Sequence, residues 1–289
     1  MTDHIIKKLA NNTIEVTIDI AWNEIKSHYD KAFDRLLNKF SYTGFRKGKV
    51  PKSIAEKQIK KETVYQELLK NLLPSLYQSI IEKENLKPVV SPKIELLSGN
   101  DNEDWKFKIS IAERPEIILG QYKKAIKDLN EKLKKPEIWV PGKDKQTENK
   151  SNNNKINKNI NEILSLLIKV VICKLSDLII EEQLNQRLAR LVDEIQKIGL
   201  TVDQYLKSTN ITIEQLKNRL KDEISTTYKI EYILLEIADK ERITVDNTDL
   251  EKLFSNIKDD KEKADAKANS YLYASILRKQ KTIDFLTSL

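Results

Sequence analysis

The sequence changes its hydrophobic period within residues 14–40, which read IEVTIDIAWNEIKSHYDKAFDRLLNKF. At the start of this stretch apolar and polar side chains alternate, which is typical of a strand with one buried face. From Trp22 onward the apolar side chains recur every three or four residues, as in a helix with one buried face, at Ile25, Tyr29, Ala32, Phe33, Leu36, Leu37 and Phe40. The turn-prone pair Asn11 and Asn12 stands before the strand, with a short apolar stretch before it. We therefore expect a β-hairpin followed by a long helix.

A second helical pattern covers residues 52–84. Pro51 is suited to open this helix, because its fixed φ already lies near the helical value. Apolar side chains four residues apart indicate one buried stripe, made of Val64, Leu68, Leu72, Leu76 and Ile80. Pro74 lies inside the pattern, so we expect a kink or a break near it.

Two strand candidates follow, at residues 93–97 and 105–112. In the second, charged or polar residues alternate with Trp105, Phe107, Ile109 and Ile111. A hairpin, helices and a returning hairpin together predict a compact α+β domain over residues 1–127.

The rest of the chain is predicted to be a linker followed by helices. Residues 142–161 contain seven Asn and five Lys with little apolar periodicity, so we expect residues 128–161 to form an Asn/Lys-rich linker. Beyond it, helical periodicity continues without a competing strand pattern, and capping boxes start at Thr201 and Thr212. The fold class is therefore α+β, with an all-α C-terminal domain of long helices at residues 162–289.

The composition excludes several kinds of site. The 289 residues include one Cys and two His, which excludes an intramolecular disulfide and gives no cluster for zinc. No phosphate-binding glycine loop or nucleophile motif is present, so we expect no catalytic residue, no cofactor and no metal. The first residues do not resemble a signal peptide, and the apolar stretch Ile163–Ile172 is too short and too interrupted to span a membrane. We expect a soluble, cytoplasmic protein that does not contact membranes.

Positive charge is concentrated in the N-terminal part. The formal net charge is +7; residues 1–127 carry 23 basic and 17 acidic side chains, and residues 162–289 carry 20 and 22. Between positions 44 and 61 only Glu56 opposes a set of cations, Arg46, Lys47, Lys49, Lys52, Lys57, Lys60 and Lys61. Such a stretch predicts either an acidic partner such as nucleic acid or a solvated lysine-rich face.

The segment between the two predicted helices reads Gly44-Phe45-Arg46-Lys47-Gly48-Lys49-Val50-Pro51. Its glycines allow tight turns, which places Phe45 at the tip of a loop, where a core residue is not expected. Arg46 and Lys47 offer a guanidinium fork and a point charge for phosphate and backbone contacts. An exposed aromatic side chain beside cations is suited to dock on RNA or on a ribonucleoprotein. The alternative is a surface turn whose Phe45 folds back onto its own domain.

The stretch Gly44–Pro51 resembles the ribosome-docking signature of the bacterial trigger factor family, G-F-R-x-G-K-x-P, at every fixed position. The predicted elements resemble the N-terminal domain of that family in their order, and residues 178–206 resemble its helical C-terminal domain. The resemblance implies that Phe45, Arg46 and Lys47 contact the ribosome near the nascent-chain exit. It also implies that the loop is shaped or supported by Gly44, Gly48, Lys49 and Pro51.

The resemblance implies a ribosome-associated, ATP-independent chaperone that shields unfolded nascent polypeptides, and it leaves a weak homodimer open. Full-length family members usually carry a peptidyl-prolyl isomerase domain of roughly one hundred residues between the two parts. The connection from Leu129 to Leu164 is far shorter and has Trp139 as its only aromatic residue, so we expect no isomerase activity. Two alternatives stay open: an isomerase with an unrecognised site, and an RNA-binding or ribosome-assembly module without chaperone action.

Overall fold

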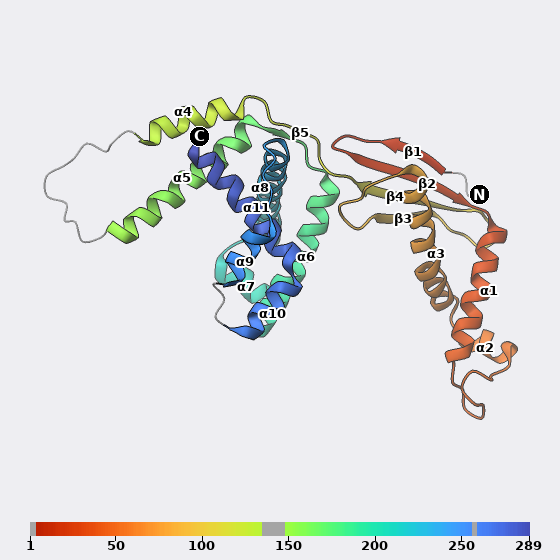
Figure 1. The fold of residues 1–289 in the computed structure, drawn as a ribbon. Helices are drawn as coiled ribbons and strands as arrows, with labels where there is room; N and C mark the ends of the chain where they lie inside the picture. Colours follow the sequence, from red (N-terminus) through yellow and green to blue (C-terminus); the bar gives the residue numbers. More distant parts are fainter. Residues whose placement is uncertain (1–3, 135–147, 256–258) are drawn as a thin grey trace. The chain divides into compact units, whose positions relative to one another are not determined.

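The computed structural model divides the chain into two compact units (Figure 1) and describes residues 4–134, 148–255 and 259–289. The first unit runs to Arg114 and also includes residues 176–182, and the second unit contains residues 115–175 and 183–289. The division between the units therefore falls before Pro115 and not at the expected residue 127.

The first unit is built on a four-stranded antiparallel sheet with the strand order β1-β2-β4-β3. Its strands are β1 (His4–Lys8), β2 (Thr13–Ile20), β3 (Lys93–Ser98) and β4 (Trp105–Ala112). The β1–β2 hairpin turns at Asn11 and Asn12, which both have positive φ, 59° and 51°, as a type I′ turn requires. The hairpin that the asparagine pair predicts and the two later strands are confirmed.

Three helices lie entirely in the first unit: α1 (Trp22–Lys39), α2 (Lys52–Gln58) and α3 (Lys61–Glu84). The first residues of α6 (Asp177–Lys197) also belong to it. The pattern expected as one helix over residues 52–84 is thus divided, because Ile59 adopts an extended backbone (φ −82°, ψ 118°) and packs against the core. By contrast, α3 continues through Pro74, so no break occurs there. Leu72 and Leu76 are buried on either side of the proline, and this packing outweighs the hydrogen bond that proline cannot donate.

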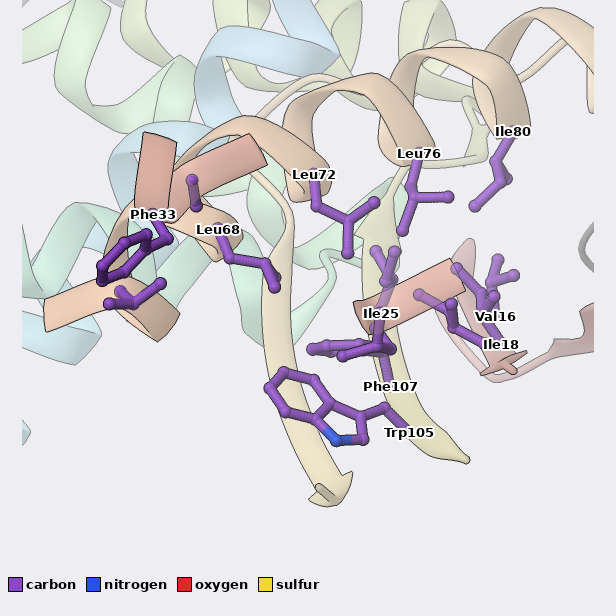
Figure 2. Close-up of a cluster of buried hydrophobic side chains, with 14 of the residues drawn as sticks. Val16, Ile18, Ile25, Phe33, Leu68, Leu72, Leu76, Ile80, Trp105 and Phe107 are labelled. Carbon is purple, nitrogen blue, oxygen red and sulfur yellow. The ribbon is translucent and has the colours of Figure 1, made fainter. Parts of the chain in front are cut away.

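A single hydrophobic core joins the sheet to α1 and α3. Figure 2 shows the α3 side chains pointing toward the strands from Leu68, Leu72, Leu76 and Ile80. Alternate residues of the central strands meet them, including Val16, Ile18, Trp105 and Phe107, each at most 2% exposed. The two periodicities read from the sequence therefore describe the two faces of one core.

The second unit consists mainly of helices: α4 (Tyr122–Lys134), α5 (Glu148–Val170), most of α6 (Asp177–Lys197), α7 (Val202–Thr209), α8 (Ile213–Lys240), α9 (Asn247–Ser255), α10 (Asp260–Ala268) and α11 (Ser270–Ser288). The long helices expected for residues 162–289 are confirmed. The second unit also contains a short two-stranded antiparallel sheet of β5 (Ile117–Ile118) and β6 (Ile172–Cys173). Two residues per strand are too few to show an alternating pattern in the sequence. In the described ranges, no helix is both long enough and apolar enough to cross a membrane.

The core of the second unit explains the position of the division between the units. Leu119, Tyr122 and Ile126 are buried in this core together with residues of α5, α8 and α11. The Tyr122 hydroxyl donates a hydrogen bond to the Glu241 carboxylate at 2.7 Å. Lys123 and the Tyr122 hydroxyl hold the pKa of Glu241 below its usual range. These contacts attach the segment after Arg114 to later helices of the second unit.

Part of the expected linker is helical. Of the expected linker, residues 128–134 belong to α4 and residues 148–161 to α5, while residues 135–147 lie outside the described residues. Ile163 and Leu167 are buried in the core, at 2% and 1% exposed. The helix extends toward its N-terminus from this anchor, because each added residue gains one backbone hydrogen bond once a helix is nucleated. The described parts of the expected linker, residues 128–134 and 148–161, are therefore helical.

Candidate functional site

The loop between α1 and α2 lies at the end of the first unit that is farthest from the sheet (Figure 1). Both ends of the loop are fixed. At the first, the Phe40 N–H donates to the Leu37 carbonyl at 3.1 Å. At the second, Val50 is buried and Pro51 forms the N-cap of α2. The residues between them are therefore held at a defined place on the surface.

Two consecutive turns give the loop its path. The Phe45 N–H donates to the Tyr42 carbonyl at 3.0 Å, and the Lys49 N–H donates to the Arg46 carbonyl at 2.9 Å. A glycine holds the third position of each turn, with φ of 89° at Gly44 and 75° at Gly48, which fits a type II turn. Main-chain bonds thus fold the loop and leave its side chains available for contacts.

The two glycines differ in the space around them. A Cβ atom on Gly44 would meet nothing within 4 Å, whereas a Cβ atom on Gly48 would lie 2.6 Å from the Asn38 carbonyl oxygen. The Gly48 N–H also donates to the Phe40 carbonyl at 2.9 Å, which ties the loop to the end of α1. Gly48 is therefore required both for its φ and for a close approach of two backbone segments.

We expect Gly48→Ala to destabilise the first unit more than Gly44→Ala does. Both substitutions place a side chain at positive φ, which costs about 1–2 kcal/mol. Only the alanine at position 48 also forces the backbone away from α1, for a total of about 2–4 kcal/mol. The check is the urea midpoint of tryptophan fluorescence for both variants. Equal midpoints would show that the contact with Asn38 relaxes at no cost.

The side chains at the tip of the loop face solvent. Phe45 is 40% exposed, and Arg46, Lys47 and Lys49 are exposed as well. The Phe45 ring contacts the Tyr42 ring, with 6.5 Å between centroids, so Phe45 is supported by the loop itself and is not buried in the core. The tip therefore presents one supported aromatic ring beside three cations.

The neighbouring cations divide into paired and unpaired groups. Lys52 pairs with Asp34 at 2.6 Å and Lys61 with Asp101 at 3.0 Å. Among the residues that the structure describes, no ion pair involves Arg46, Lys47 or Lys49. The unpaired cations of the loop are those next to Phe45, and they can bind carboxylate or phosphate groups on a partner without first giving up a partner of their own.

The geometry of the loop suits binding. Phe45 can enter an apolar pocket of a partner, while Arg46 can form a two-pronged hydrogen bond with an anionic group. Over the described ranges of the chain, no three His, Cys, Asp or Glu side chains gather as metal ligands. The loop therefore offers these side chains to a partner from a backbone that main-chain hydrogen bonds hold in place.

The loop lies within a region that matches a known family. The family model described as "Bacterial trigger factor protein (TF)" matches residues 2–153, which is more than half of the chain. The chain belongs to the trigger factor family. A second model, for the trigger factor C-terminus, matches residues 143–288 and overlaps the first.

Curated trigger factors match part of the chain. The trigger factor of Shouchella clausii (strain KSM-K16) is 37% identical over 117 residues, which make up 40% of this chain and 27% of that protein. The trigger factor of Pelotomaculum thermopropionicum (strain DSM 13744 / JCM 10971 / SI) is 28% identical over 142 residues, or 49% of this chain and 31% of that protein. The chain thus spans less than a third of the length of these relatives.

A solved structure shares the fold of the whole chain. It is described as "Promiscuous Substrate Recognition in Folding and Assembly Activities of the Trigger Factor Chaperone". Its TM-score with this chain is 0.65 at 16% identity, over 98% of this chain and 99% of that one. At this identity the similarity establishes a trigger factor fold for both units.

One residue of this trigger factor loop, Tyr42, is not among the predicted site residues. Tyr42 is 38% exposed and stacks between Phe40 and Phe45. Its position in the sequence could have indicated an exposed aromatic side chain, because Tyr42 lies two residues before Gly44 and outside the helical stripe that ends at Phe40. The motif begins at Gly44 and therefore does not include Tyr42.

Proposed function

We propose that this chain is a cytoplasmic, ATP-independent chaperone that docks on the ribosome near the nascent-chain exit and shields unfolded nascent polypeptides. The observation that carries the proposal is the loop Gly44–Pro51. Two glycine turns present Phe45, Arg46 and Lys47 to solvent at the far end of the first unit. Membership of the trigger factor family supports the choice of the ribosome as partner.

Cosedimentation with purified ribosomes tests the docking step. We expect the protein to pellet with ribosomes at low salt and to pellet less at high salt. The reason is that contacts of Arg46 and Lys47 with anionic groups at the surface are screened by salt. Absence from the ribosome pellet at low salt would contradict the proposal.

We assign the shielding of clients to the second unit. Three large apolar side chains are exposed near the start of α11: Tyr271 at 89%, Leu272 at 59% and Ile276 at 52%. Such a patch can bind unfolded segments weakly and reversibly, which lowers the concentration of chains able to aggregate without any nucleotide. Since the three side chains contribute little to the core, they are available for this role.

Replacing Tyr271, Leu272 and Ile276 together by serine should reduce the suppression of client aggregation several-fold. The reason is that the variant loses apolar contact area for unfolded chains while its fold is kept. Light scattering of a refolding client without ATP is the measurement, and circular dichroism verifies the helices. Ile198→Ser is the control, because Ile198 is 67% exposed but lies outside the patch. Equal losses in the control would mean that the patch has no special role.

We also propose that isomerase activity is absent. The two family models overlap at residues 143–153, so the two parts of the family follow each other directly in this chain. An isomerase needs a shaped, mostly apolar pocket for the proline ring. Where the structure describes this connection, a cavity of about 640 Å³ between α4 and α5 has no aromatic ring in its lining, which consists of Leu129, Lys158, Asn161, Glu162, Ser165, Leu166 and Lys169. A proline-peptide assay should give the uncatalysed rate. A catalysed rate would favour the isomerase alternative.

A further inference from the structure

Three aromatic rings form a row from the core of the first unit to the tip of the loop. Phe40 packs against the core cluster. The Tyr42 ring stacks on Phe40 with centroids 6.3 Å apart and an angle of 17° between the rings. The Phe45 ring lies 6.5 Å from Tyr42 at 35°. Tyr42 is therefore the link between an anchored ring and the ring at the tip.

Tyr42 is also joined to Phe45 through the backbone. Its carbonyl accepts the hydrogen bond of the first turn from the Phe45 N–H at 3.0 Å. The base of the loop is fixed independently, because the Phe40 carbonyl accepts from the Gly48 N–H at 2.9 Å. The main chain thus fixes the position of the Phe45 Cα atom. The ring of Tyr42 restricts the directions in which the Phe45 side chain can point.

We propose that Tyr42 is a positioning residue for ribosome docking: its ring holds Phe45 in the orientation that binds. This inference rests on the proposed function. A solvent-exposed phenylalanine that samples several rotamers loses that freedom on binding, and this loss weakens affinity. A neighbouring ring that already restricts Phe45 reduces the rotamer freedom that is lost on binding. Tyr42 and Phe45 form an aromatic pair of the usual tilted geometry that can do this.

The side chain of Tyr42 offers two contributions that can be separated. Its ring supports Phe45, and its hydroxyl could contact a partner directly. The positioning role depends on the ring alone, so Tyr42→Phe keeps it and Tyr42→Ala removes it. The role also acts through Phe45, so removal of Tyr42 has no further effect once the Phe45 ring is absent.

The experiment is a double-mutant cycle on the affinity for purified ribosomes, measured by cosedimentation over a range of ribosome concentrations. The variants are Tyr42→Ala, Tyr42→Phe, Phe45→Ala and the double alanine variant, with Ser41→Ala as an exposed control in the same loop. We expect Tyr42→Ala to raise Kd about threefold to tenfold, as loss of an aromatic pair would. Tyr42→Phe and Ser41→Ala should stay within about twofold of the unchanged protein, and the double variant should equal Phe45→Ala.

Three results would overturn the positioning role: an unchanged Kd for Tyr42→Ala, a Kd for Tyr42→Phe as high as that for Tyr42→Ala, or effects of Tyr42→Ala and Phe45→Ala that add. Nuclear Overhauser contacts between the ring protons of residues 42 and 45 give a second test in the protein without ribosomes. Their absence would also overturn the role. If Phe45→Ala binds ribosomes as the unchanged protein does, the docking assignment itself fails, whatever the contacts between the rings.

Discussion

Simultaneous replacement of Phe45, Arg46 and Lys47 by alanine is expected to abolish ribosome cosedimentation. Aromatic and arginine side chains at the centre of an interface commonly contribute 2 kcal/mol or more each, so the combined loss should raise Kd by at least about 100-fold. The fold should survive, because all three side chains are exposed and the loop is closed by main-chain hydrogen bonds. Cosedimentation at low salt measures binding, and circular dichroism verifies that the helices are intact.

A control for this variant must remove the same charge and a similar apolar surface elsewhere in the first unit. The edge strand β1 offers such a set, since Ile5 is 70% exposed and Lys7 and Lys8 are exposed beside it. Their triple alanine variant loses two cations and one apolar side chain. It should pellet with ribosomes nearly as well as the unchanged protein. If both triple variants lose binding equally, general electrostatic attraction and not the loop is responsible.

The sequence predicts the elements whose burial is decided by near neighbours in the chain. The alternation from Ile14 to Ile20 and the stripe that includes Leu68 and Ile80 both appear in the structure as buried faces. Prediction from the sequence fails where packing against residues far away in the chain decides whether a helix ends or continues. Ile59 interrupts the helical pattern because its side chain packs against the core. Helix α3 continues through Pro74 because residues on both sides of the proline are buried in the same core. Neither the break at Ile59 nor the continuation through Pro74 can be predicted from the neighbouring residues in the sequence alone.

The second unit gives a related lesson about boundaries. The charge and composition of the segment around residue 127 fit either unit. Tyr122 and Ile126 are assigned to the second only by a core whose other members lie far away in sequence, on α8 and α11. In the same way, α5 extends into the asparagine-rich segment because Ile163 and Leu167 nucleate a helix that local composition does not favour.

Within the candidate site, the sequence predicts the chemistry better than the geometry. The motif identifies an exposed Phe45 with cations beside it and two glycine turns. It does not show that a Cβ atom on Gly48 would lie only 2.6 Å from the Asn38 carbonyl oxygen. It also does not show the stacking of Tyr42. The close approach at Gly48 and the stacking of Tyr42 both depend on the path of the backbone after α1. The residue types in the motif do not determine that path.

The second large effect is expected from Phe107→Ala, which should destabilise the first unit by about 3–5 kcal/mol. Phe107 is 1% exposed at the centre of the sheet, opposite Ile18 of β2 and Leu96 of β3, and its ring lies 6.1 Å from that of Trp105. Alanine would leave a cavity between the sheet and α3. Leu96→Ala is the matched control, since Leu96 is a direct neighbour across the strands but 48% exposed, and its loss should cost about 1 kcal/mol.

The consequence for function follows from the separation of the two cores. The buried cluster around Phe107 consists of residues of the first unit, and the cluster around Ile126 consists of residues of the second. The Phe107→Ala substitution should therefore lower the urea midpoint of tryptophan fluorescence, to which Trp22 and Trp105 of the first unit contribute. Most of the helical circular dichroism should be lost at an unchanged urea midpoint. Ribosome binding should fall with the folded fraction of the first unit, because Phe40 anchors the loop to that core, whereas suppression of client aggregation should persist. A single shifted transition in both signals would mean that the units unfold together, and docking and shielding would then be lost together.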